Sequence, residues 1–273
     1  MIKNWLITGD THGKTALRLA GIQESMPEYK PEETAVIILG DVGFNYYKNK
    51  KDWKAKHQAS SYGYTLYCLR GNHEDRFSNS KTEIVYQYDP AVDGMIMYEN
   101  EFPNIKYFLD WVNSYIIMGK HVLTIPGAYS VDKWYRLQND WMWFPEEQLT
   151  AEEMQEAEDE FKDGEFDLVL SHTAPIDWEP TDLFLSMIDQ STVDKTMEVW
   201  LGKFKDMIDW GIWLFGHYHK DRIERPYVEQ FYNEVEPLDT VFARWDKYKE
   251  TGELDWWLPK SPNFWMGVES EAK

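Results

Sequence analysis

The chain has 273 residues, of which 43% are hydrophobic, and a formal net charge of −20 at pH 7. That length accommodates one large domain or two small ones with a sizeable core, and the absence of any apolar run of about 18 residues excludes a membrane span. The acidity argues against long nucleic acid as a partner, because such partners are bound through clustered Lys and Arg that neutralise phosphates.

The cellular compartment is indicated by two features. The N-terminal segment MIKNWLITGD lacks the basic and apolar blocks of a secretory signal. The single cysteine, Cys68, has no partner for an internal disulfide and sits in an apolar segment. We therefore expect a cytoplasmic protein.

Seven short β-branched or aromatic runs predict strands, and the polar segments between them predict helices. The expected strands are 4–8, 35–39, 64–69, 114–118, 121–125, 166–170 and 211–215, and the expected helices are 14–26, 52–61, 151–162 and 194–209. Residues 36–39 and 168–170 are continuously apolar, as is typical of strands covered on both faces. Mixed sheets flanked by helices follow, so the predicted class is α/β.

Two local signals sharpen this prediction. The turn residues Met118-Gly119-Lys120-His121 between two strands indicate an antiparallel hairpin. Thr150 followed by Glu153 has the pattern of a capping box, which predicts that a helix begins at residue 151.

Five of the predicted strands are followed directly by polar side chains that bind metals. The segments read GDTH, GD, RGNHE, SH and GHYH, in chain order. Their side chains include Asp10, His12, Asp41, Asn72, His73, His172, His217 and His219. Open α/β sheets bind ligands at the carboxyl ends of their strands, so these groups are expected to converge. The remaining two histidines, His57 and His121, lie outside the pattern.

Taken singly, each segment is an ordinary turn or loop, but five in this position predict a metal centre. Two divalent ions about 3.5–4 Å apart clamp the attacking and departing oxygens of a phosphoryl group. Such a pair needs a shared ligand, which a carboxylate provides and an imidazole does not. The mixture of nitrogen and oxygen donors suits Mn, Fe, Zn or Co better than Ca.

The order of these motifs resembles that of the calcineurin-like metallophosphoesterases. Their pattern is Asp-x-His, Gly-Asp, Gly-Asn-His-Glu/Asp, a lone His and then Gly-His-x-His. The resemblance spans residues 4 to about 220. It implies a two-sheet β-sandwich flanked by helices, with the metal site at the carboxyl ends of the strands.

The resemblance also implies roles for the site residues. One metal would be held by Asp10, His12 and His219, and a second by Asn72, His172 and His217, with Asp41 as the bridge. A metal-bridging hydroxide would act as the nucleophile, and His73 would act as general acid or leaving-group stabiliser. The two ions are expected to be manganese. The expected activity is hydrolysis of phosphate esters, with a phosphorylated small molecule or peptide as substrate.

The subfamily is marked by one likeness and one departure. LRGNHE is similar to the motif of the phosphoprotein phosphatases, yet Phe44 and Asn45 stand where those enzymes carry an Asp and an Arg. Glu74 and Asp75 are the two carboxylates that could orient His73 instead. The segment 125–150 is similar to one in small bacterial and phage phosphoesterases, and its Arg136 is a candidate phosphate ligand because guanidinium pairs bidentately with phosphate.

Other interpretations are a non-catalytic binding or scaffold module on the same fold, which would have lost ligands, and an amidohydrolase barrel. That barrel would place His-x-His on its first strand, and this chain does not. Within the enzyme hypothesis, phosphoprotein and nucleotide phosphatases or phosphodiesterases remain alternatives. We expect the catalytic domain at 1–240 and an aromatic C-terminal extension at 241–273 packed on it, since this tail is too aromatic for disorder.

Overall fold

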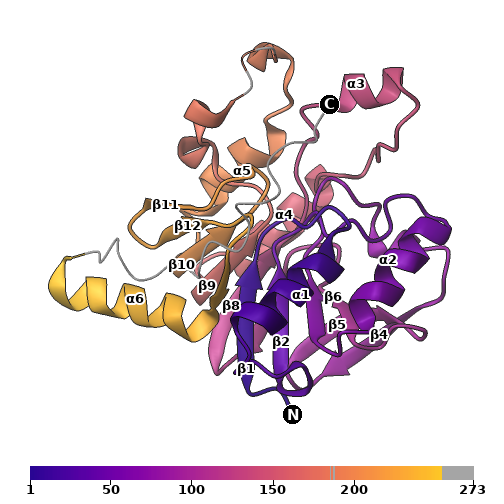
Figure 1. Cartoon of the computed structure of the whole chain (residues 1–273). Helices are drawn as coiled ribbons and strands as arrows, with labels where there is room; N and C mark the ends of the chain where they lie inside the picture. Colours follow the sequence, from indigo (N-terminus) through magenta and orange to yellow (C-terminus); the bar gives the residue numbers. More distant parts are fainter. Residues whose placement is uncertain (185, 187, 254–273) are drawn as a thin grey trace.

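The structure, a computed structural model, describes residues 1–184, 186 and 188–253. Two β-sheets pack face to face and helices cover their outer faces (Figure 1). The predicted two-sheet sandwich flanked by helices is therefore confirmed.

The first sheet has seven strands in the order β13-β1-β2-β3-β6-β5-β4. The strands are β1 (Asn4–Thr8), β2 (Thr34–Ile38), β3 (Thr65–Cys68), β4 (Ile84–Asp89), β5 (Gly94–Glu99), β6 (Ile105–Tyr107) and β13 (Val235–Pro237). The four central strands β1, β2, β3 and β6 are parallel, and the edges are antiparallel. The carboxyl ends of β1, β2 and β3 therefore meet at one edge of this sheet.

The second sheet has six strands in the order β11-β12-β10-β9-β8-β7. They are β7 (Asn113–Ile117), β8 (Lys120–Ile125), β9 (Glu165–Ser171), β10 (Asp209–Phe215), β11 (Arg222–Arg225) and β12 (Val228–Gln230). β8, β9, β10 and β12 are parallel, whereas β7 and β8 form the predicted antiparallel hairpin. The two sheets thus each offer a row of parallel strand ends.

Alternation of side chains along the strands builds three hydrophobic layers. Ile7, Ile37, Leu168 and Leu214 lie in the layer between the sheets. Their neighbours along each strand point outward, where the helices cover them. The strands are consequently apolar on both faces, which explains the continuous runs in the sequence.

Four helices supply the outer layers. α1 (Thr15–Ser25) and α2 (Lys50–Ser60) contribute to the cluster outside the first sheet, and α4 (Ala151–Phe161) and α5 (Thr196–Phe204) to that outside the second. α4 begins with the predicted capping box, in which Thr150 and Glu153 exchange bonds between side chain and backbone of 3.2 and 2.8 Å. The short α3 (Lys133–Gln138) stands on a connection that projects beyond the strand ends (Figure 1).

Several element predictions were wrong. Strands β4, β5 and β6 and helix α3 were not predicted, and the helix expected at 194–209 occupies only Thr196–Phe204, with Asp209 already in β10. β4 is an edge strand with weak burial, since Tyr86 and Tyr88 are about half exposed. β6 has three residues, which is too short for a periodic signal.

The C-terminal part continues the same body as far as it is described. The segment after His219 forms β11, β12 and β13, and α6 (Leu238–Thr251) packs Val241 and Trp245 into the layer between the sheets. Of the predicted extension, residues 254–273 lie outside the described residues. Among residues 1–184, 186 and 188–253, no helix is both long and apolar enough to cross a bilayer.

Candidate metal centre

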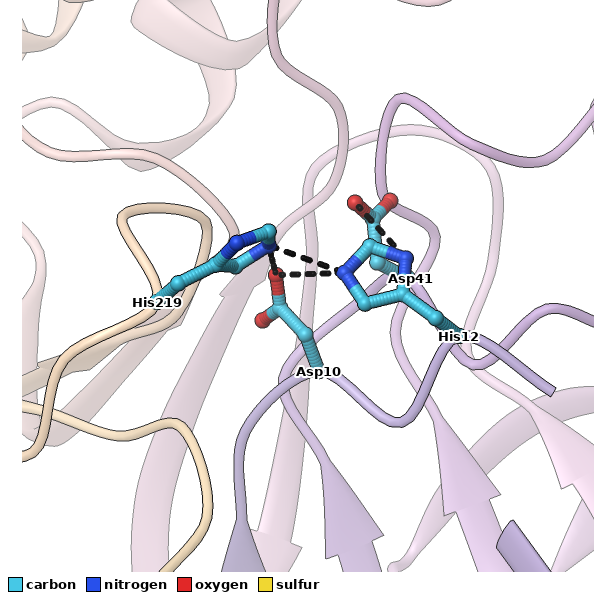
Figure 2. A group of neighbouring side chains, drawn as sticks. All are labelled: Asp10, His12, Asp41 and His219. Carbon is cyan, nitrogen blue, oxygen red and sulfur yellow. Dashed lines mark hydrogen bonds and ion pairs between the residues drawn. The ribbon is translucent and has the colours of Figure 1, made fainter. Parts of the chain in front are cut away.

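The predicted ligands lie at the carboxyl ends of five parallel strands. Asp10 and His12 follow β1, Asp41 follows β2 and Asn72 follows β3. From the second sheet, His172 follows β9, and His217 and His219 follow β10. Figure 2 shows how Asp10, His12, Asp41 and His219 converge above the strand ends.

The first group of side chains consists of Asp10, His12, Asp41 and His219. Each offers one potential ligand atom, and these four atoms all lie within 4.8 Å of one another. The Nε2 atoms of His12 and His219 are 2.8 Å apart. Asp10 Oδ2 lies 3.4 Å from His219 Nε2 and 3.8 Å from His12 Nε2. Three donor atoms from two sheets therefore point at one small volume.

The second group shares Asp41 with the first. His172 Nε2 lies 3.0 Å from Asn72 Oδ1 and 3.4 Å from Asp41 Oδ1. The His217 ring packs edge-on against His172 at a centroid distance of 5.1 Å. The other carboxylate oxygen of Asp41, Oδ2, lies 4.0 Å from His12 Nδ1. Asp41 thus stands between the two groups with one oxygen toward each.

Four of these residues have a left-handed backbone, which side chains other than glycine rarely adopt. The φ angles are 44° at His12, 46° at Asp41, 70° at His217 and 55° at His219. Each such residue costs on the order of 1–3 kcal/mol and persists where the surroundings fix it, most often at functional sites. These strained backbone conformations lower the stability of the fold and set the directions of the four side chains.

Two glycines make room for the carboxylates. A Cβ on Gly71 would overlap Asp41 Oδ1, and a Cβ on Gly216 would overlap Asp10 Oδ1. Glycine is the residue that permits such close approach. The glycines before Asn72 and His217 in the sequence motifs thus have a steric reason.

The donor set fits a divalent transition metal. Asp10 Oδ2 is buried and accepts no hydrogen bond within the described residues, a costly state for a carboxylate oxygen without a cation. His172 Nδ1 donates to the Leu39 carbonyl at 2.7 Å, which directs Nε2 toward Asp41 and Asn72. This backbone contact sets the tautomer that a metal requires. Histidine and carboxylate donors together suit Mn, Fe, Zn or Co.

The carboxylates of Asp41 and Asp10 favour a positive charge between them. Burial lowers the pKa of His172, but Asp41, through its charge and a hydrogen bond, and then Asp10 outweigh burial and raise it to about 9. Without a bound cation, a proton on His172 thus balances the carboxylates. By contrast, burial together with the charge on His172 lowers the pKa of His217 to about 3.

The chain is similar to a known protein family and to a solved structure. Residues 4–221 match the model of the calcineurin-like phosphoesterase family. The chain belongs to that family. The crystal structure of TT1561 of Thermus thermophilus is similar, with 12% identity and a TM-score of 0.48 over 88% of this chain and 96% of that one. No curated protein matches the sequence.

Glu74 joins two of the loops that carry predicted ligands, a role that was not predicted. The fully buried Glu74 carboxylate accepts hydrogen bonds from Gly43 N at 2.7 Å and Gly71 N at 2.8 Å. It therefore joins the loop that carries Asp41 to the loop that carries Asn72. Burial and the charge of Asp41 raise the pKa of Glu74 to about 8.

A second supporting chain orients Asn72 and was also missed. Asn72 Nδ2 donates to Ser130 Oγ at 3.0 Å, and Ser130 Oγ donates to Glu147 Oε2 at 2.6 Å. All three side chains are buried. The contact fixes the amide so that Oδ1 faces His172. No local sequence signal indicated it, because Ser130 and Glu147 reach Asn72 only through the fold.

His73 contacts an arginine rather than either predicted carboxylate. Arg136 Nη2 lies 3.0 Å from His73 Nδ1 and also contacts Nε2. Asp132 accepts from Arg136 Nε at 2.8 Å, whereas Glu74 binds the glycine amides and Asp75 pairs with Lys48. Burial, helped by His12 and Arg136 and opposed by Asp41, lowers the pKa of His73 to about 4.

Proposed function

We propose that this calcineurin-like phosphoesterase hydrolyses phosphate esters with two divalent ions bound side by side. The observation that carries the proposal is the position of Asp41. One of its carboxylate oxygens lies 3.4 Å from His172 Nε2, and Asp41 also belongs to the cluster with Asp10, His12 and His219, whose facing ligand atoms lie within 4.8 Å of one another. A carboxylate between two sets of ligands is what a pair of ions requires, because it binds both at once.

We assign one ion to the set from β1 and β10, and the other to the set from β3, β9 and β10. The first would be held by Asp10, His12 and His219, and the second by Asn72, His172 and His217, with Asp41 shared. When bound, such a pair supplies an activated water and positive charge beside the phosphoryl oxygens. Manganese is our first choice, with iron, zinc or cobalt as alternatives for the same donors.

Two further side chains would handle the substrate. His73 Nε2 lies 3.7 Å from Asp41 Oδ2, so its ring borders the centre and is placed to give a proton to the departing alcohol oxygen. Arg136, which is buried and contacts His73, is our candidate to bind a phosphoryl oxygen. Arrival of the phosphate would give the guanidinium a second anionic partner beside Asp132 and release the His73 ring. The substrate we expect is a phosphorylated small molecule or peptide.

The direct test combines metal content with hydrolysis. Protein loaded with manganese and freed of excess ion should contain close to two equivalents per chain by elemental analysis. It should also hydrolyse chromogenic phosphate monoesters or diesters, and lose that activity with a chelator. One equivalent or less after reconstitution would refute the paired site, and two equivalents without hydrolysis of any ester would favour a binding module.

Replacement of Arg136 tests the phosphate contact. Arg136→Ala is expected to lower kcat/KM about tenfold to 100-fold, since hydrogen bonds to charged groups are worth about 1.5–3 kcal/mol, while both metals remain. Arg136→Lys should restore only part of the loss because lysine lacks the bidentate fork. The control is Gln138→Ala, an exposed position on the same helix. Steady-state kinetics identical to those of the unchanged protein would remove Arg136 from the site.

A further inference from the structure

A cavity of about 490 Å³ opens directly beside the metal centre. One side is formed by Asp41, Asn72, His73, His217 and His219. A phosphoryl group at the centre would therefore extend its organic group into this space. The volume lies within the range of clefts that bind small organic molecules, about 300–1,000 Å³.

The walls of the cavity beyond the metal centre are largely apolar. Tyr129 and Val131 come from the connection between β8 and α3, and Phe184 and Val193 come from the segment between β9 and α5. Neither segment carries a predicted ligand beyond His172 at its start. These walls belong to connections rather than to the strands whose ends carry the predicted ligands.

The charges around the cavity disfavour a second anion. Among the described residues that line the cavity, Lys195 is the one lysine or arginine. Its Nζ lies 2.5 Å from Glu179 Oε1, so its charge is already paired. The other acids on the walls are Asp132, which pairs with Arg136, and Glu198. Oxygen Oε2 of Glu198 is buried and has no hydrogen-bond partner within the described residues. A second phosphate or a carboxylate placed here would meet like charge without a free cation.

We infer that this cavity binds the alcohol portion of the phosphate ester, and that this portion is apolar and carries no negative charge. The inference rests on the proposed function, because that function places the phosphate at the metal centre. Aryl and alkyl phosphates fit the walls. Nucleoside polyphosphates and acidic phosphopeptides do not, and they serve as opposing ligands in the test.

The experiment measures binding and turnover along a chain-length series. Straight-chain alkylphosphonates from ethyl to hexyl are titrated into the manganese-loaded protein by calorimetry, and the matching alkyl phosphates are assayed for kcat/KM. Both affinity and kcat/KM should rise about twofold to fourfold per methylene. A fourfold rise corresponds to about 0.8 kcal/mol, the free energy of burying one methylene group. A terminal carboxylate on the longest chain should cancel the gain.

Variants locate the effect on the cavity wall. Val193→Lys adds a cation to the wall and should flatten the chain-length dependence while favouring the carboxylate-tipped phosphonate. The control is Val199→Lys on α5, which is 42% exposed and lies outside the cavity. Melting temperatures of both variants verify that they fold.

The outcomes separate the two hypotheses. Affinity that is flat along the series, or a preference for the carboxylate-tipped chain in the unchanged protein, overturns the inference even if esters are hydrolysed. Affinity that rises with chain length without hydrolysis of the matching phosphates supports the cavity assignment and refutes the proposed reaction.

Discussion

Asp41→Asn is expected to be the most damaging replacement among the predicted metal ligands. The carboxylate faces both ligand groups, and an amide offers only one neutral oxygen, so both ions should bind more weakly at once. Loss of a partner in the outer shell of a metal already costs about 10–100-fold, so we expect a loss above about 100-fold in kcat/KM. Elemental analysis should show fewer than two metal equivalents.

A matched control separates metal binding from the loss of a buried acid. Asp89, the last residue of β4, is also a buried carboxylate, and it accepts from Tyr67 Oη at 2.6 Å and Lys106 Nζ at 2.5 Å. Asp89→Asn should lower the free energy of unfolding but keep both metals. If Asp41→Asn retained two equivalents, the bridging assignment would be wrong.

The second large effect is expected for His73→Asn, and its size should depend on the leaving group. Asparagine keeps a polar side chain but provides no titratable proton donor. General acid assistance contributes about 10²–10⁴-fold, so the rate on alkyl phosphates should fall by that factor. p-Nitrophenyl phosphates release a stable phenolate and should lose less. The comparison is made at equal metal content and pH, with chemistry limiting the rate.

The exposed His57 on α2 provides the control. His57→Asn should leave both rates unchanged. An equal fractional loss on the two substrates of His73→Asn would assign His73 to positioning or charge stabilisation, and loss of a metal ion would assign it to the structure of the site. Each result points to a different contact of the same ring.

The parts of the fold that were predicted share one physical origin. Strands such as β2 and β9 are buried on both faces, so their apolar runs are unbroken and end abruptly at a glycine or a polar ligand. The change from apolar to polar residues in the sequence therefore indicated both where each strand ends and where the predicted ligands lie. The edge hairpin of β4 and β5 was missed because exposed Tyr86 and Tyr88 interrupt that contrast.

The site contacts that were not predicted involve residues on the connections between elements rather than at the strand ends. The contact of Arg136 with His73 joins residues 63 positions apart, and Arg136 lies on the short helix α3 beyond the strand ends. Ser130 and Glu147 likewise reach Asn72 only after their connection has folded. Motif order carries information on groups held directly at strand ends. It carries none on side chains delivered from the loops above them.

The pairing of the first strand with the last has a consequence for the order of events during synthesis. β1 lies between β2 and β13, and Leu6, Ile7 and Thr8 pair with Pro237, Glu236 and Val235. The ligands likewise run from Asp10 to His219. Contacts of such sequence separation form late, since closing a long loop has to precede them. A nascent chain that has not yet extruded β10 lacks His217 and His219, one from each predicted ligand group. We therefore expect binding of the proposed pair of ions to follow synthesis of the chain through His219.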